Sequence, residues 1–170
     1  MSAGGDKPQI VSPIKTTECP YPIYSNSTTD EGLYGYTNNA KIFDESVTVS
    51  ARGTIGFVCL RHIPYVPIVR LVTLVPDQSI ISAKYLYFWL KHLRISGTGT
   101  TQQQLTVPYF QNTKILLPDH ETMIRFDNLA APMFNEIWKN QEENTKLSSL
   151  RDVLLPQLMS GKLDVNNINI

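Results

Sequence analysis

The last part of the chain carries an apolar repeat whose spacing suits one side of a helix. Beyond Pro118, apolar side chains recur every three or four positions from Met123 to Leu158, and polar residues fill the gaps. Asn144 is a polar break in the repeat, a feature often found in the seams of paired helices. The pattern predicts a coiled-coil-type helical arm. The residues expected in its helix-pairing seam are Phe126, Met133, Ile137, Asn144, Leu147, Leu150, Leu154 and Leu158.

Three breaker residues set the expected limits of this arm. Pro132 would interrupt a continuous helix, so we expect a short helix Glu121–Ala130, a kink or break, and a long helix Met133–Leu155 that ends before Pro156 and Gly161. A helix over 121–155 would be about 50 Å long at roughly 1.5 Å per residue. An apolar stripe of that length needs a partner helix from the same domain, a second copy or another subunit.

Residues 1–118 have the pattern of short strands with one helix. Aromatic, alternating or β-branched runs predict strands at 21–24, 33–37, 46–51, 55–60, 68–75 and 113–117. Ser82 is a plausible N-cap for a helix Ala83–Leu93, whose leucines and Trp89 form one stripe. We therefore expect an α+β fold: a β-rich globular domain with one or two helices over 1–118, a helical arm over 119–162 and a C-terminal tail over 163–170.

Composition limits the class of protein. Hydrophobic residues make up 42% of the 170 positions, enough for a real core. No apolar run approaches the roughly 20 residues that span a bilayer, and the polar start lacks the apolar stretch of a secretory signal. Cys19 and Cys59 belong to no metal-binding pattern, so we expect reduced thiols. These features together predict a cytoplasmic protein without a membrane partner.

The net charge of zero hides an uneven distribution. Residues 1–118 carry ten Lys and Arg against seven Asp and Glu, whereas residues 119–170 carry five against eight. Between Arg52 and Arg94, inclusive, there are six cations and one acid, Asp77. Such a region could place a positive face against phosphates, but it could equally be scattered surface charge.

Three polar segments offer groups that could read DNA. The loop Ser96–Gln104 is rich in Thr and Gln, which can bond to base edges, although a solvated loop is the plain alternative. Arg52–Gly56 could serve a turn or contact DNA, and the same choice holds for Ser25–Ser27. Cations nearby are generic phosphate candidates. The candidate DNA-binding residues are Ser25, Asn26, Arg52, Thr54, Lys84, Lys91, Arg94, Thr98, Thr100, Thr101, Gln102 and Gln103.

Several motifs point to one family. The run from Lys146 to Val165, Lys-Leu-Ser-Ser-Leu-Arg-Asp-Val-Leu-Leu-Pro-Gln-Leu-Met-Ser-Gly-Lys-Leu-Asp-Val, resembles the end of the spacer helix in type I restriction–modification specificity (S) subunits. Gly4–Pro8, Tyr21–Ser27, Arg52–Gly56 and Gly99–Thr106 resemble, in order, the signatures of a target-recognition domain, and Thr113–Pro118 resembles the strand before the helix. The chain thus looks like the C-terminal half of a specificity subunit, or a natural half-length version.

This resemblance implies sequence-specific DNA recognition on behalf of other subunits. Methyltransferase (M) subunits would methylate adenine with S-adenosylmethionine, restriction (R) subunits would cleave with ATP, and the arm would pair with a second copy or a second S half. The chain has no Asn/Asp-Pro-Pro-aromatic motif, phosphate loop or HExxH, so we expect no catalytic residue, cofactor or metal of its own. The alternative is a coiled-coil adaptor or decoy subunit without its own DNA reading.

Overall fold

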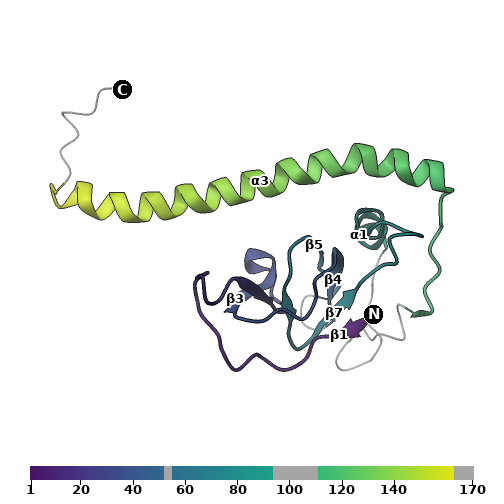
Figure 1. Cartoon of the computed structure of the whole chain (residues 1–170), viewed down its shortest axis with the longest axis horizontal. Coiled ribbons are helices and arrows are strands. Elements are labelled where there is room, and N and C mark those ends of the chain that lie inside the picture. Colours follow the sequence, from purple (N-terminus) through teal and green to yellow (C-terminus); the bar gives the residue numbers. More distant parts are fainter. Residues whose placement is uncertain (52–54, 94–110, 163–170) are drawn as a thin grey trace. The chain divides into compact units, whose positions relative to one another are not determined.

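The computed structural model describes residues 1–51, 55–93 and 111–162, and it has the predicted α+β class (Figure 1). The chain divides into two compact units, Met1–Asp127 and Asn128–Ile170. The first contains two small sheets, the short 3-10 helix η1 (Thr29–Gly32) and helix α1 (Ala83–His92). Helix α3 (His120–Met159) begins in the first unit and continues through the second.

The larger sheet has the strand order β1-β7-β4-β5, and every neighbouring pair is antiparallel. Its strands are β1 (Ser2–Ala3), β7 (Leu71–Leu74), β4 (Ser46–Ser50) and β5 (Val58–Arg61). Val47 and Val49 of the central strand β4 are completely buried, and α1 packs against β4 and β5. β-branched residues form these strands because their side chains pack well on a pleated surface.

The smaller sheet has the strand order β3-β2-β6, and its core includes Ile68, the residue that directly follows β6. Strand β2 (Tyr21–Tyr24) is antiparallel to β3 (Leu33–Thr37) and parallel to β6 (Val66–Pro67). Ile23, Val66 and Ile68 form a buried cluster. The strand predicted over 68–75 is shorter, because Arg70 takes a left-handed conformation (φ 73°) and β7 begins only at Leu71.

Two other strand predictions also need correction. Strand β5 begins at Val58 rather than Ile55, since Gly56 lies in a turn with φ 82°. Residues 113–117 lie in no strand, and the Leu116 carbonyl instead accepts a hydrogen bond from the Tyr85 hydroxyl at 2.9 Å. By contrast, the predicted cap of α1 is confirmed: the Ser82 hydroxyl accepts a bond from the Tyr85 amide at 3.1 Å.

Of the kink or break expected at Pro132, the break is wrong, and so is the end expected before Pro156, because α3 is one helix of 40 residues with both prolines inside it. Each proline removes the hydrogen bond to the carbonyl four residues earlier. Those carbonyls belong to Asn128 and Asp152, both exposed residues, so water can satisfy them. At about 1.5 Å per residue, the helix is about 60 Å long.

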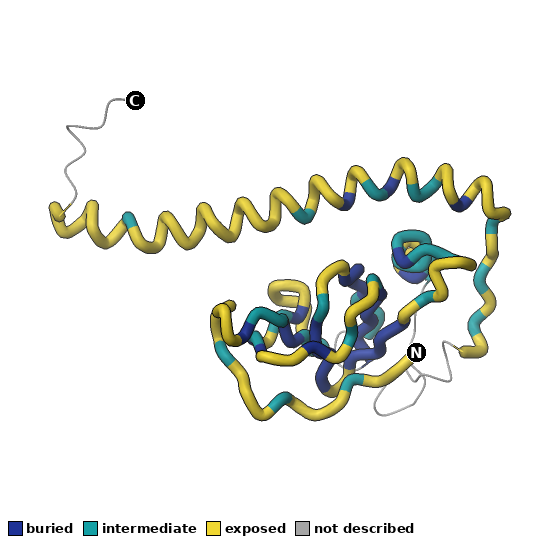
Figure 2. Tube along the Cα trace, viewed as in Figure 1, coloured by how far each residue is buried: buried dark blue, intermediate teal, exposed yellow. Residues whose placement is uncertain are grey.

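Most of α3 is exposed along its length (Figure 2). Phe126 and Leu154 of the predicted seam are partly buried, whereas the other six seam positions are exposed, including Met133 at 65% and Leu147 at 55%. The ring of Phe134 lies 5.6 Å from that of Trp138 one turn later. In the described part of the chain, no helix is long and apolar enough to cross a membrane.

Candidate nucleic-acid interface

The connection between β2 and β3, residues Ser25–Gly32, is closed at its base by hydrogen bonds between its two ends. The Ser25 amide donates to the Gly32 carbonyl at 2.7 Å, and the Ser25 hydroxyl reaches the same oxygen at 3.3 Å. Gly32 has φ 87°, and a Cβ there would lie 2.4 Å from the Ser25 carbonyl oxygen. Only glycine therefore fits the closing position.

The tip of this β2–β3 connection has an unusual backbone and an exposed polar surface. Asp30 and Glu31 have φ of 47° and 54°, in the left-handed backbone region that residues other than glycine rarely adopt. Ser27, Thr28 and Thr29 are exposed beside them, whereas the predicted contacts Ser25 and Asn26 are only partly exposed. Each strained residue costs on the order of 1 kcal/mol or more, so neighbouring contacts must hold this conformation in place.

Those contacts come from the polar side of β4. Alternation along the strand puts Ser46, Thr48 and Ser50 on the side opposite the two valines, and all three are buried. The Ser50 hydroxyl donates to the Asn26 carbonyl at 3.2 Å, and the Ser46 hydroxyl lies 2.9 Å from that of Tyr65. This side of β4 is thus a polar contact surface, and one of its bonds reaches the β2–β3 connection directly.

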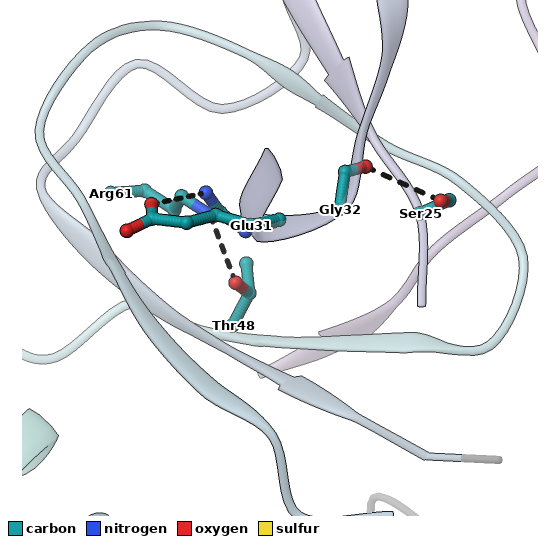
Figure 3. A network of polar contacts seen from close by, with 5 residues as sticks. All are labelled: Ser25, Glu31, Gly32, Thr48 and Arg61. Carbon is teal, nitrogen blue, oxygen red and sulfur yellow. Dashed lines mark hydrogen bonds and ion pairs between the residues drawn. The ribbon is translucent and has the colours of Figure 1, made fainter. Parts of the chain in front are cut away.

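Arg61, the last residue of β5, makes the strongest link to the same connection (Figure 3). Its side chain is 3% exposed, and its Nε donates to the Thr48 hydroxyl at 3.0 Å. One terminal nitrogen donates to the Glu31 carbonyl at 2.6 Å, and the other lies 3.5 Å from the Glu31 carboxylate. A buried cation needs such partners, because an unpaired one would be strongly destabilising.

The Tyr24 ring completes the surroundings of this cation. The Arg61 guanidinium carbon lies 3.6 Å from the ring centroid, a cation–π contact. Burial raises the pKa of the Tyr24 phenol above its ordinary value of 10.0, although the charge of Arg61 opposes that shift. Burial likewise raises the pKa of the Cys59 thiol, so this cysteine is a neutral packing residue at neutral pH.

Comparison with known proteins identifies the family. Residues 10–145 match the model of the type I restriction modification DNA specificity domain. The chain belongs to this family. Specificity domains are generally non-catalytic, and in the described parts of this one no three His, Cys, Asp or Glu side chains group to hold a metal.

Individual relatives agree with this assignment. The chain is 32% identical, over 78% of its length, to a Mycoplasma pneumoniae protein named as a type I specificity subunit. It is 27% identical, over 88% of its length, to the specificity subunit of the type I restriction enzyme HindI of Haemophilus influenzae. It spans only 39% and 35% of these two relatives.

A solved structure shares the fold of this specificity domain. The type I restriction–modification S subunit from M. genitalium superposes with a TM-score of 0.66 at 18% identity, covering 94% of this chain and 42% of that one. The predicted likeness to one half of a specificity subunit is therefore confirmed, since each of these relatives is more than twice as long as the matching region.

One of the polar segments that the sequence singled out in this specificity domain, Ser25–Ser27, contacts the end of β4. The bond from Ser50 to Asn26 places the β2–β3 connection at the start of the turn between β4 and β5. The same turn closes through the Gly56 amide, which donates to the Ser50 carbonyl at 3.0 Å. Arg52 and Thr54 of this turn lie outside the described residues, and so do Arg94, Thr98, Thr100, Thr101, Gln102 and Gln103.

The two remaining cations, Lys84 and Lys91, both lie on α1 and have local partners. The Lys84 ammonium is 2.8 and 2.9 Å from the two carboxylate oxygens of Glu45, and both side chains are largely buried. Lys91 lies 4.8 Å from the Tyr87 ring centroid and is exposed. Their role as phosphate contacts stays a prediction. The geometry favours Lys91 for that role, because the ammonium of Lys84 is already paired with the Glu45 carboxylate.

Sequence reasoning missed Arg61 as an organising residue and passed over Thr28 and Thr29, whereas for Ser27 it left a turn and a DNA contact open. Arg61 was counted among generic phosphate candidates, but its burial leaves it facing Glu31 and Thr48 instead of solvent. The signal available in the sequence was its place at the end of an apolar strand, where an arginine requires buried partners. Thr28 and Thr29 directly follow Ser25–Ser27, the segment for which a turn and a DNA contact were both open.

Proposed function

We propose that this chain recognises a specific DNA sequence as half of a type I specificity subunit and so directs adenine methylation and DNA cleavage by partner subunits. The observation that carries the proposal is the family match over residues 10–145. It is supported by the exposed hydroxyls of Ser27, Thr28 and Thr29, which lie in a connection whose Asn26 carbonyl accepts a bond from Ser50 at the end of β4.

The groups at this surface suit the reading of base edges in a groove. Hydroxyls can donate to or accept from any base, and the carboxylates of Asp30 and Glu31 can accept only from donors such as the cytosine amino group. The basic residues from Arg52 to Arg94, other than the buried Arg61 and the paired Lys84, would supply phosphate contacts, which fix the position of a protein on DNA without reading sequence. The proposal makes the β2–β3 connection a reading element and the cations an anchor.

Helix α3 supplies the connection to other subunits in this proposal. Its exposed apolar seam would pair with the helix of a second copy or of a second specificity half, so that two recognition domains meet one divided site. The M and R subunits would assemble around this pair in the cytoplasm. S-adenosylmethionine and ATP would belong to those partners, and no catalytic step is assigned to this chain.

Binding to a pool of DNA duplexes with a randomised central segment tests the proposal. Affinity should fall as salt rises, by about 40-fold between about 50 and 200 mM for about three phosphate contacts. The bound fraction should be enriched in one sequence. A linked dimer of the full chain should be tested in parallel, since one domain makes few contacts. Folded protein that binds no duplex at low salt, alone or linked, would exclude DNA recognition.

A second candidate function is favoured by the exposed side of α3. Ile137, Leu150 and Leu158 are 49%, 52% and 42% exposed in the single chain. A coiled-coil adaptor or decoy subunit would need only this surface. It would capture an M subunit or a second specificity half but show no salt-dependent DNA binding, so the same pool experiment separates the two functions.

A further inference from the structure

Two buried side chains of the larger sheet hold the tip of a connection that belongs to the smaller one. Arg61 and Ser50 stand at the ends of β5 and β4, and they bond to the backbone carbonyls of Glu31 and Asn26 at 2.6 and 3.2 Å. A hydrogen bond to a backbone carbonyl fixes the path of the main chain, and it does so independently of the side chain of the accepting residue. The two bonds therefore control the shape of the connection without using the hydroxyls of Ser27, Thr28 or Thr29.

The shape that they fix is one the chain would not keep by itself. Asp30 and Glu31 both have positive φ, and Arg61 holds the second of them by its carbonyl at the point where the chain turns back toward Gly32 (Figure 3). Arg61 is itself fixed from two sides, by the Thr48 hydroxyl and by the Tyr24 ring. An arginine is suited to this role because its planar fork donates in several fixed directions.

We propose that Arg61, assisted by Ser50, is a positioning residue for sequence discrimination: it holds the β2–β3 connection so that Ser27, Thr28 and Thr29 face DNA in one arrangement. This inference rests on the proposed function. Neither Arg61 nor Ser50 touches DNA in this account, since both side chains are buried. Loosening the connection should blur the choice of bases and leave the phosphate-driven part of binding nearly intact.

Substitutions along one strand supply the test and its control. Ser46 and Ser50 are both completely buried on the same side of β4, but only Ser50 contacts the connection, while Ser46 bonds to Tyr65. Arg61→Lys and Ser50→Ala should speed hydrogen exchange in the peptide covering residues 25–33 by about tenfold and about fivefold, the loss of one charged and one neutral hydrogen bond. Ser46→Ala should leave that exchange unchanged.

Selection from the randomised duplex pool with the same full-length variants completes the experiment. Arg61→Lys and Ser50→Ala should lower the enrichment of the preferred sequence at least about fivefold, while affinity for unselected duplex at low salt stays within about twofold of wild type. If Arg61→Lys does not fold, Ser50→Ala decides the matter. Enrichment as sharp in Ser50→Ala as in Ser46→Ala would overturn the positioning role. A wild-type chain that enriches no sequence would instead overturn the proposed function, and the exchange rates would still show whether these residues hold the connection.

Discussion

At the scale of single residues, Gly4 lies very close to the backbone of Ile68, between β6 and β7, and this contact predicts which substitutions the edge strand β1 tolerates. A Cβ at Gly4 would lie 2.1 Å from the Ile68 carbonyl oxygen, and the Gly4 amide donates to the Leu71 carbonyl at 2.7 Å. Gly4→Ala must therefore push β1 away from β7, and we expect it to lower the free energy of unfolding by about 1–2 kcal/mol.

Urea unfolding followed by circular dichroism measures this change, and the next residue provides the control. A Cβ at Gly5 would meet only the Lys41 ammonium at 3.4 Å, at the end of a flexible side chain. Gly5→Ala should leave the unfolding midpoint close to that of the wild type. Equal midpoints for the two variants would show that the edge strand tolerates the shift.

The hydrogen bonds of Asp119, directly before α3, make part of the stability of the fold dependent on pH. Its carboxylate accepts bonds from the Thr122 amide at 2.9 Å and the Thr122 hydroxyl at 2.8 Å, and these bonds hold the pKa of Asp119 below its ordinary value of 3.8. A carboxyl whose pKa is lowered by folding stabilises the fold above the unfolded pKa. That stabilisation is lost as the pH falls through the lower, folded value.

Asp119 directly precedes α3, and its bond from the Thr122 amide caps that helix. Two substitutions separate the effect of this cap from the effect of the Asp119 charge. Asp119→Ala should lower the melting temperature at neutral pH, whereas Asp119→Asn should keep most of the cap because asparagine also caps helices well. Both should remove this residue's share of the acid-induced loss of stability, measured as melting temperature between about pH 2 and 6. An unchanged acid profile in both variants would mean that the bond to Thr122 does not contribute.

At the scale of secondary-structure elements, Phe126 shows how one end of α3 is anchored. Its ring lies 5.6 Å from Tyr85 and 6.0 Å from Phe88 of α1, edge to face in both pairs. Such pairs add to the stability gained by burying the ring, so Phe126→Ala should cost about 2 kcal/mol in urea unfolding. Met133→Ala, at an exposed position of the same predicted seam, should have little effect on the single chain. Similar losses in both would contradict this distinction.

The same helix shows what sequence patterns can and cannot predict. The spacing from Met123 to Leu158 predicted the helix and its exposed apolar seam, because periodicity depends only on local geometry. It assigned Phe126 to the seam, whereas in the structure that ring has partners in α1, and it left a kink or a break open at Pro132, where the helix continues. Both outcomes depend on the residues and solvent around the helix, and the spacing of residues along the sequence carries no information about those surroundings.

The candidate site was less predictable than the fold for a related reason. The sequence predicted a turn or a DNA contact for Ser25–Ser27, but the residue that holds this connection at Glu31, Arg61, lies 30 positions away from Glu31 in the sequence. The sequence predicted a strand over 46–51, but it gave no sign that the polar residues Ser46, Thr48 and Ser50 would be buried, as they are in the structure. Contacts between two sheets decide these roles, and a single sequence does not show which strands face one another.

At the scale of the whole molecule, the exposed seam of α3 predicts association between chains. Exposed apolar side chains recur from Met133 to Leu158, over a length that a single soluble helix does not leave in water without a partner. Purified full-length chain should therefore form a dimer in sedimentation equilibrium. Replacing Ile137 and Leu150 together by Asp should shift it to monomer, since each charge would have to be buried without a partner in the paired state.

A matched change on another side of the helix makes this result specific. Lys139 and Glu142 are exposed, lie three residues apart on the side away from Ile137 and are not one turn from Leu150, so replacing both by Ala keeps the net charge and the helix while leaving the seam intact. That variant should remain a dimer. If it dissociates as readily as the Ile137 and Leu150 double variant, general helix stability and not the apolar seam controls association. A wild-type chain that is monomeric at all concentrations would mean that α3 needs a different chain as its partner, and the recognition domain would then act only after that partner had bound.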